Sequence, residues 1–428
     1  MVFKHLSFKI VLFKKSCLRK LYYIFLFLVS ANPTLYAQTT FNSDAAVRSV
    51  YHGVDSSLER DLVDVTHKFF HKKNKLTIDS AKEHVQHKYN LAIVPAVGYT
   101  LQTGFAGILS ANIGYFNNGS NKISSITTSI TYSQYQQTIV PLVLNIWTKN
   151  DKFNLVSDNR FIDYPSSIYG LGGRTDPNKG HTIDFIGLKL HESVLMLIRK
   201  NIYAGIGYYY DQFWNIRAIN PATRRINTII TKELGFDETA SGPVVKFLYD
   251  NRQNQINPTQ GLYANLVLRN SFTFLDGDQN FQSLLIDVRK YLPFPHKYSK
   301  NILALWSYNW LTIAGTPPYL LLPSTGWDDQ YNTGRGYIQG RFRGRNMVYL
   351  EGEYRYRISR NGLIGGVVFA NVENFSGDLS QQYNTLLPGY GLGVRVKLNK
   401  HSGTNLCVDY GFGKNGSGGF YVNIGEVF

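Results

Sequence analysis

Residues 125–132 read Ser-Ile-Thr-Thr-Ser-Ile-Thr-Tyr, and their alternation predicts a β-strand with one apolar and one polar face. Successive side chains of a β-strand point to opposite faces. One face here carries Ile126, Thr128, Ile130 and Tyr132, and the other carries Ser125, Thr127, Ser129 and Thr131. The first face suits lipid and the second suits water, as in a transmembrane β-barrel. The buried face of a soluble β-sandwich would show the same alternation, so this pattern alone leaves both architectures open.

Strand number and loop length separate the two architectures. Alternation continues from about residue 90 to the end, where Leu392, Val394, Val396 and Leu398 oppose Gly391, Gly393, Arg395 and Lys397. We expect sixteen strands, which begin near residues 90, 105, 122, 138, 151, 181, 201, 243, 262, 281, 301, 346, 363, 389, 405 and 419. Closed bacterial barrels have an even number of strands, with short periplasmic turns that alternate with longer external loops. Stretches 117–121, 359–362 and 399–404 fall on the short side, and 166–180, 216–242, 314–345 and 376–388 fall on the long side. The sequence therefore predicts an all-β fold, a 16-stranded antiparallel transmembrane β-barrel over residues 90–428.

The amino terminus predicts export. Six cations, Lys4, Lys9, Lys14, Lys15, Arg19 and Lys20, precede an apolar run from Leu21 to Val29. This run is shorter than the roughly 20 residues of a membrane-spanning helix, and small Ala37 suits the last position before cleavage. We expect a signal peptide over residues 1–37, a mature start at Gln38 and a location in the bacterial outer membrane.

Composition limits the partners. The formal net charge of +16 includes the six cations before Gln38, which leaves +10 for the rest, a moderate excess that does not indicate nucleic acid. Scattered Arg and Lys suit the phosphates of lipopolysaccharide, so outer-membrane lipids are the expected partners. Cys17 and Cys407 are the two cysteines, and loss of the signal peptide leaves one, so no internal disulfide is expected. Metal-ligand spacings and phosphate-binding glycine loops do not occur, and we expect neither a metal nor a cofactor.

A short periplasmic segment, residues 38–89, precedes the predicted barrel. Residues 56–72 carry Leu58, Leu62, Val65 and Phe69 at helical spacing, which predicts a short amphipathic helix. Two roles are open for this helix: a linker, or a lid or plug docked under the barrel.

Arg335-Gly336-Tyr337 lies in the predicted loop between strands 11 and 12. It resembles the arginine-glycine-aromatic motif of the BamA/TamA family of outer-membrane assembly barrels, also called bacterial surface antigens. It is the most specific of four motifs that carry this resemblance, over roughly residues 90–428. The resemblance implies that this loop folds into the lumen and that Arg335 meets a carboxylate there. The alternation turns Glu351, Glu353 and Asp409 inward as candidate partners. An exposed basic loop over lipopolysaccharide is the alternative.

The other three motifs are looser matches. A periplasmic turn between strands 8 and 9 is expected from Asp250, Arg252, Pro258 and Gly261, in which Pro and Gly build a tight turn and Asp and Arg cap its backbone. Residues 369–373 occupy the place of phenylalanine-x-aspartate-x-glycine, but Asn371 lacks the aspartate's charge and Glu373 replaces a small residue. The anchoring carboxylate is therefore expected at Glu373 or Asp409. Residues 409–413 and 425–428 resemble the last hairpin, whose terminal aromatic, Phe428, would close the barrel.

The resemblance implies insertion, assembly or translocation of outer-membrane proteins through a seam between the first and last strands. Proline lacks an N–H and glycine packs weakly, so the seam residues are expected to be Pro95, Gly98, Gly425 and Phe428. The family's periplasmic POTRA domains do not fit into 52 residues, which predicts a barrel-only branch that receives its clients directly or from a separate periplasmic partner.

Two other classes of function are open. A passive pore or structural barrel needs only the polar inner face. An outer-membrane enzyme is the weaker alternative, and we expect no enzymatic activity. Four histidines lie in the predicted barrel: His296 and His401 map to the periplasmic side and His191 to a strand. The fourth, His181, has no obvious Ser or Asp partner at catalytic spacing.

Overall fold

The computed structural model describes residues 59–62, 64–65, 90–100, 102–117, 119–120, 122–219, 237–297, 299–329, 331–377, 385–400 and 403–428. The chain divides into two compact units, residues 1–57 and 58–428, and every described residue belongs to the second. The predicted signal peptide lies outside the described residues, as does most of the predicted helix 56–72, of which residues 62, 64 and 65 are helical. Within the described part of the chain, no helix is long and apolar enough to cross a bilayer.

The described elements are almost entirely strands. They are β1 (Asn90–Thr100), β2 (Gly104–Phe116), β3 (Ile123–Ser133), β4 (Thr138–Trp147), β5 (Phe153–Asp163), β6 (Ser166–Ile168), β7 (His181–Arg199), β8 (Ile202–Ile219), β9 (Glu238–Asp250), β10 (Gly261–Ser271), β11 (Phe281–Pro293), β12 (Ile302–Gly315), β13 (Asn346–Arg357), β14 (Ile364–Phe375), β15 (Leu387–Asn399), β16 (Thr404–Phe412) and β17 (Gly418–Ile424). Short 3₁₀ helices lie between them: η1 (Lys149–Asp151), η2 (Pro177–Lys179), η3 (Thr273–Leu275), η4 (Tyr319–Leu321) and η5 (Lys414–Gly416).

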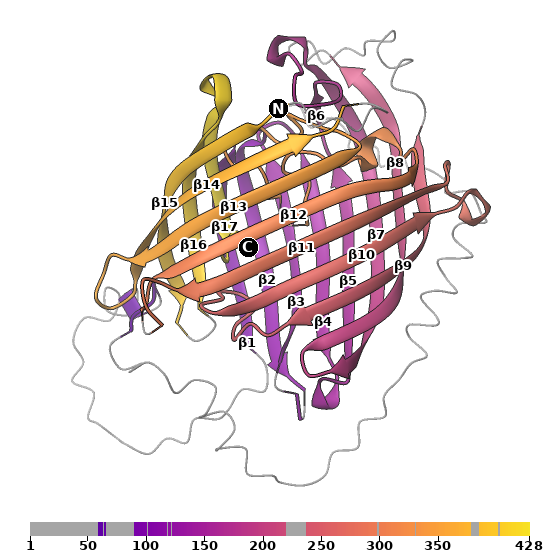
Figure 1. The fold of residues 1–428 in the computed structure, drawn as a ribbon. Coiled ribbons are helices and arrows are strands. Elements are labelled where there is room, and N and C mark those ends of the chain that lie inside the picture. Colours follow the sequence, from indigo (N-terminus) through magenta and orange to yellow (C-terminus); the bar gives the residue numbers. More distant parts are fainter. Residues whose placement is uncertain are drawn as a thin grey trace, which may run out of the picture. The chain divides into compact units, whose positions relative to one another are not determined.

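Sixteen long strands form the wall of a nearly closed antiparallel barrel, which confirms the predicted fold. Each pairs with the next along the chain from β1 to β17, and the short β6 pairs beside β5 on the outer extension of β7. Figure 1 shows these strands strongly tilted around the barrel. The predicted starting points agree within a few residues, and β9 differs most, because it begins at Glu238 rather than near residue 243.

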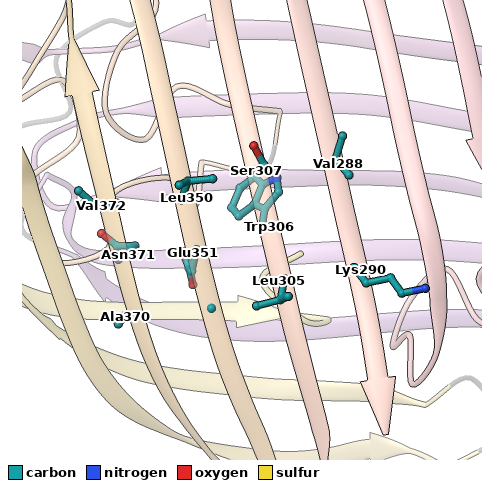
Figure 2. Close-up of a pocket in the computed structure, with 11 residues that line it drawn as sticks. Val288, Lys290, Leu305, Trp306, Ser307, Leu350, Glu351, Ala370, Asn371 and Val372 are labelled. Carbon is teal, nitrogen blue, oxygen red and sulfur yellow. The ribbon is translucent and has the colours of Figure 1, made fainter. Parts of the chain in front are cut away.

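The two faces of the wall differ as the alternation predicts. Large apolar side chains such as Ile130, Leu350 and Leu392 are exposed on the outside, where the hydrocarbon of the membrane would cover them. Residues of the opposite parity, such as Arg395 on β15, are buried inside the barrel. A hollow in the outer wall over β11–β14 is lined by Leu305, Leu350 and Ala370 among others (Figure 2). Gly352 also lines it.

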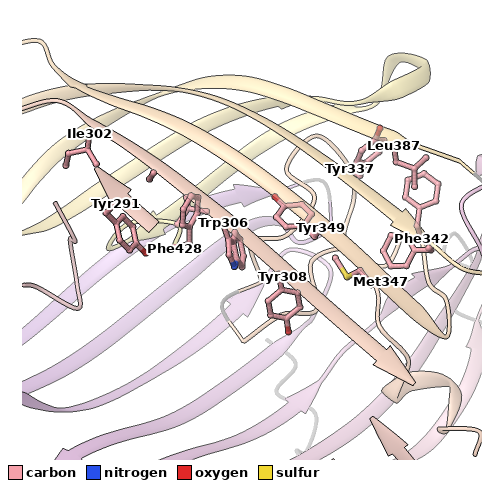
Figure 3. Packing of buried hydrophobic residues seen from close by; sticks show 13 residues of the cluster. Tyr291, Ile302, Trp306, Tyr308, Tyr337, Phe342, Met347, Tyr349, Leu387 and Phe428 are labelled. Carbon is pink, nitrogen blue, oxygen red and sulfur yellow. The ribbon is translucent and has the colours of Figure 1, made fainter. Parts of the chain in front are cut away.

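The core lies inside the barrel. One cluster of buried apolar residues joins β11, β12 and β13 to the loop 316–345 and to the last residues of the chain (Figure 3). A second cluster joins β5, β7, β8 and β9 to the same loop. We call residues 316–345 the lumenal loop; residue 330 lies outside its described part. This loop packs against two sides of the wall and fills space that would otherwise hold water.

Candidate functional site

The lumenal loop carries a fully buried arginine, Arg335, which is surrounded by carboxylates. The side chain of Arg335 is 0% exposed, and its guanidinium forms ion pairs with Glu351, Glu353 and Asp409. The two glutamates come from β13 and the aspartate from β16. The structure thus brings together Arg335 and three of its predicted partners, and the alternative of an exposed basic loop is wrong.

Further ion pairs surround these residues, and we call the whole group the arginine cluster. Arg355 donates to Glu353 at 2.6 Å, and Arg395 pairs with Asp409 and, at 2.9 Å, with Glu426. The cluster therefore alternates three guanidiniums with four carboxylates, which are Glu351, Glu353, Asp409 and Glu426. Buried charges persist only where opposite charges and hydrogen bonds surround them. Arg355, Arg395 and Glu426 were missed as partners, although the inward parity of the two arginines was a usable signal.

Two residues of the motif at 369–373, which lies on β14, contact Arg335 in ways that the sequence did not indicate. The ring of Phe369 lies 3.7 Å from the guanidinium, a cation–π contact. Asn371 donates from Nδ2 to the backbone oxygen of Arg335 at 2.9 Å. An ionised aspartate could not donate this bond. The departure from the family motif therefore anchors the loop's backbone, while the carboxylates of β13 and β16 hold its charge.

Glu373 takes a different partner from the one expected. Its Oε1 accepts a hydrogen bond from Oγ1 of Thr325 in the lumenal loop at 2.9 Å. Of the two predicted anchors for the guanidinium, Asp409 is the one in contact, and the expectation for Glu373 is wrong. Both residues still bind the same loop, at different points along it.

Gly336 and Tyr337 fix the path of the chain beside Arg335. Gly336 has φ +118°, and a Cβ there would lie 2.6 Å from the backbone oxygen of Phe412, so glycine is required. Its N–H donates to the hydroxyl of Tyr421 on β17 at 2.9 Å. Tyr337 is buried and donates from its hydroxyl to the backbone oxygen of Pro388 at 2.6 Å. The motif thus joins the loop to β15, β16 and β17.

The lumenal loop is also held by the opposite part of the wall. Arg160 on β5 donates to the backbone oxygen of Asp329 at 2.5 Å and lies over the ring of Tyr331 at 5.0 Å. Trp327 packs edge to face against Tyr164 at 5.8 Å. The loop therefore bridges the lumen from β5 to β13–β17.

The last four residues, which we call the C-terminal tail, leave the sheet. We expected the last strand to end on Phe428, but β17 ends at Ile424, and Gly425 has φ +96°, a conformation that turns the chain away from the strand. Phe428 is 3% exposed and stacks on Trp306 at 5.0 Å, between Trp306 and Tyr291 (Figure 3). The expectation that Phe428 lies at the seam is therefore wrong, because an aromatic pocket in the lumen buries it better than the barrel's edge.

Hydrogen bonds from β13 and from the lumenal loop hold the C-terminal tail. Arg355 donates from Nη2 to the backbone oxygen of Phe428 at 3.1 Å. Asn332 of the lumenal loop donates from Nδ2 to the backbone oxygen of Val427 at 2.9 Å. The tail therefore connects the arginine cluster, the loop and the last strand.

The β9–β10 connection places its predicted ion pair as expected but is not a tight turn. Arg252 pairs with Asp250 at 2.9 Å, and its backbone N–H also donates to that carboxylate at 3.1 Å. The connection runs over residues 251–260, and Pro258 and Gly261 lie at its far end. Within this connection, Nδ2 of Asn257 donates to the backbone oxygen of Gly403, at the neighbouring β15–β16 turn, at 2.9 Å.

Residues 59–62, 64 and 65 dock on the periplasmic rim, the end of the barrel with the short turns. Glu59 pairs with Arg357 at 2.7 Å and with Lys397 at 3.5 Å. Asp64 pairs with Lys400 at 2.8 Å. Burial alone would raise the pKa of the Glu59 carboxyl, but the hydrogen bond from Arg357 and the charge of Lys397 hold that pKa below its ordinary value.

The first and last strands meet without a ladder between them. A Cβ built on Gly98 of β1 would lie 3.6 Å from Cβ of Val422 on β17, so the two strands are adjacent. Among the described residues, β1 pairs in register with β2 alone and β17 with β16 alone. Pro95 lies in β1 with its side chain exposed, as befits an edge strand. Gly425, also assigned to the seam, is instead the turn into the tail.

These features define an integral β-barrel of the outer-membrane type, with a loop and its own C-terminal tail inside the lumen. A family model described as the Omp85 superfamily domain matches residues 118–428. The chain belongs to the Omp85 superfamily, which places it in the outer membrane.

Two solved structures of CdiB share the fold at low sequence identity. CdiB from Acinetobacter baumannii is 14% identical with a TM-score of 0.52, and the match covers 79% of this chain and 60% of that one. CdiB from Escherichia coli is 11% identical with a TM-score of 0.51, covering 80% and 68%. BamA from Haemophilus ducreyi lacking POTRA domains 1-3 is 16% identical, covering 77% and 69%, with a TM-score of 0.49. Comparison with curated protein sequences gave no significant match.

Proposed function

We propose that this barrel inserts outer-membrane proteins, or translocates them, through the seam between β1 and β17. The observation that carries the proposal is the contrast between the seam and the rest of the wall. Every other pair of neighbouring long strands is joined by a ladder in the described residues, whereas β1 and β17 touch at Gly98 and Val422 without one. An unpaired strand edge offers its N–H and C=O groups to an incoming strand.

The lumenal loop and the tail support an assembly role over a passive pore. Both lie in the lumen, where they occupy space that an open pore would need for solute. Membership of the Omp85 superfamily supports the same role and argues against an enzyme. The clients would be unfolded β-barrel chains, delivered directly or by a separate periplasmic protein, after export of this chain by its amino-terminal signal peptide.

A disulfide across the seam tests the proposal. The Cβ separation of 3.6 Å between positions 98 and 422 lies within the range of disulfides, so Gly98→Cys with Val422→Cys should form one. The background is Cys407→Ser, which removes the native thiol. Phe247→Cys with Leu266→Cys is the matched control, because these residues face each other within the intact β9–β10 ladder.

The assay is insertion of a denatured β-barrel client into liposomes that contain the purified protein, followed by the heat-dependent gel shift of the folded client. We expect insertion to stop when the seam disulfide is oxidised and to return on reduction, while the control disulfide leaves it unchanged. Unimpeded insertion with the seam disulfide would refute the route. No insertion by the parent protein, together with steady ion conductance, would refute the function and leave a pore.

A further inference from the structure

A carboxylate occupies the centre of the lipid-facing surface of β7. The outward residues of this strand are Ile186, Leu188, Leu190, Glu192, Val194, Met196 and Ile198. Three apolar residues thus lie on each side of Glu192. At about 3.3 Å per residue and a tilt of about 40°, the ends of this row lie roughly 15 Å from Glu192 along the barrel axis, which puts the carboxylate near the middle of the hydrocarbon.

Neighbouring contacts establish that Glu192 points outward. His191 lies inside the barrel, where its ring contacts the buried Asp211 at 3.0 Å. Adjacent side chains of a strand point to opposite faces, so Glu192 points to the outside. Exposed apolar side chains surround it on the outer wall: Leu142, Leu155, Phe161, Val194 and Ile206.

Within the described chain, only one of the two carboxylate oxygens of Glu192 accepts hydrogen bonds. Ser157 and Asn159, on the outer face of β5, both donate to its Oε1 at 2.8 Å. Among the described residues, none donates to its Oε2. Tyr208 is directly opposite on β8, but its hydroxyl bonds to Ser241 at 2.6 Å. Oδ1 of Asn159 is buried and accepts no hydrogen bond from the described residues.

A carboxylate in the hydrocarbon region costs free energy unless another molecule donates the hydrogen bonds that it lacks. Ionisable side chains are rare within the hydrocarbon region, and those that occur there usually face the protein interior or pair with a partner. Here Oε2 of Glu192 remains for a donor that comes from the membrane side. The ammonium of lysine has three N–H donors and the guanidinium of arginine has five, so either can donate to this oxygen.

We propose that Glu192, Ser157 and Asn159 form an intramembrane docking site for a second protein, whose transmembrane segment presents a lysine or arginine at the centre of the bilayer. The opposite charges specify the chemistry of this partner, and the surrounding apolar side chains provide the contact surface. The site lies on β5 and β7, away from the seam between β1 and β17, so a bound partner leaves the seam accessible.

Among the described residues, a second copy of this chain does not offer the required cation at this depth. Lys290 on β11 also has a lipid-facing position in the described strands. It lies three residues before Pro293, the end of β11, and nearer the end of the strand than Val288 (Figure 2). Its ammonium therefore reaches the periplasmic interface rather than the centre of the bilayer. The partner is thus a different protein.

Designed transmembrane peptides test the site directly. The probe is a synthetic leucine-alanine helix with a single central lysine, and the matched peptide has norleucine at that position. Energy transfer from the labelled peptide to the labelled full-length barrel in phosphatidylcholine vesicles reports binding. We expect the lysine peptide to bind at least tenfold more tightly than the norleucine peptide, and Glu192→Gln to abolish this preference. Lys290→Gln is the control variant and should retain it.

The heat-dependent gel shift verifies that each variant is folded before binding is measured. Equal binding of the two peptides to the parent barrel would overturn the proposal. Retention of the preference in Glu192→Gln would overturn it as well. Energy transfer between differently labelled barrels that depends on Glu192 would show a second copy at the site and overturn the choice of partner.

Discussion

Replacement of Arg335 by methionine should destabilise the barrel and release the lumenal loop. The substitution keeps an unbranched side chain of comparable length but leaves Glu351, Glu353 and Asp409 without their shared cation. Arg355 and Arg395 remain to pair with Glu353 and Asp409. Among the described residues, Glu351 keeps only the hydroxyl of Tyr349 as a hydrogen-bond partner, so it bears most of the loss.

The size of the effect follows from burial. The side chains of Arg335 and of its three carboxylate partners are 0% exposed, so solvent does not screen the pairs. Removal of one member of a buried ion pair costs about 3–5 kcal/mol. With a guanidinium slope of roughly 4 kcal/mol per M, the unfolding midpoint should fall by about 1 M.

A double-mutant cycle separates the pairing from general damage to packing. Unfolding of the refolded barrel in detergent micelles is followed by tryptophan fluorescence for the parent, Arg335→Met, Glu351→Gln and the double variant. Because Glu351→Gln removes the orphaned charge, the double variant should recover at least about 1 kcal/mol relative to Arg335→Met. Planar-bilayer conductance should rise in Arg335→Met as the loop leaves the lumen. An unchanged midpoint with unchanged conductance would refute the anchoring role of Arg335.

Three further perturbations address the tail, the loop and the rim. Phe428→Ala removes the ring stacked on Trp306 and should cost about 3 kcal/mol in the same unfolding assay, whereas a tail that contributes nothing would leave the midpoint unchanged. Gly336→Ala brings a Cβ to 2.6 Å from the backbone oxygen of Phe412, so it should displace the lumenal loop and raise conductance. Gly377→Ala is the control and should not raise conductance, because its Cβ would meet no atom within 4 Å. Equal conductance in the two variants would contradict the requirement for glycine at position 336. Because the pKa of Glu59 is lowered on docking, its contribution is complete above the ordinary value of 4.5 and disappears as pH falls through the lowered value. A fluorophore on Leu62→Cys should therefore become mobile in that acidic range and stay immobile at neutral pH, and mobility independent of pH would count against this contact.

The alternation of side chains made the wall predictable. A strand with one apolar face has one usable register, because a slip of one residue would expose its polar face to lipid. The same parity placed Glu351, Glu353 and Asp409 inside the barrel, next to the position that the motif assigned to Arg335. Local periodicity thus predicted both the architecture and the acceptors of the central ion pair.

Features that depend on the path of a loop were not predictable in this way. Arg160 meets the lumenal loop only because that loop crosses the lumen, and sequence spacing does not encode the crossing. The inward turn of the tail depends on the pocket that Trp306 and Tyr291 form on other strands. The sequence indicated only that Asn371 lacks the negative charge of an aspartate. In the structure its side-chain N–H, which an aspartate does not have, donates to the backbone oxygen of Arg335.

The bridge made by the lumenal loop makes the two sides of the seam mechanically unequal. The loop contacts described above all reach elements from β5 onward, and β17 is tied to the loop twice, through Tyr421 and through Asn423, which bonds to Asn332 at 3.0 Å. β1–β3 form the other side of the seam and have no part in those contacts, whereas β4 packs Ile139 against the second cluster. On the proposed function, separation of the seam is therefore expected to swing β1–β3 outward while β17 stays tethered, so a client strand would meet a moving β1 beside a fixed neighbour.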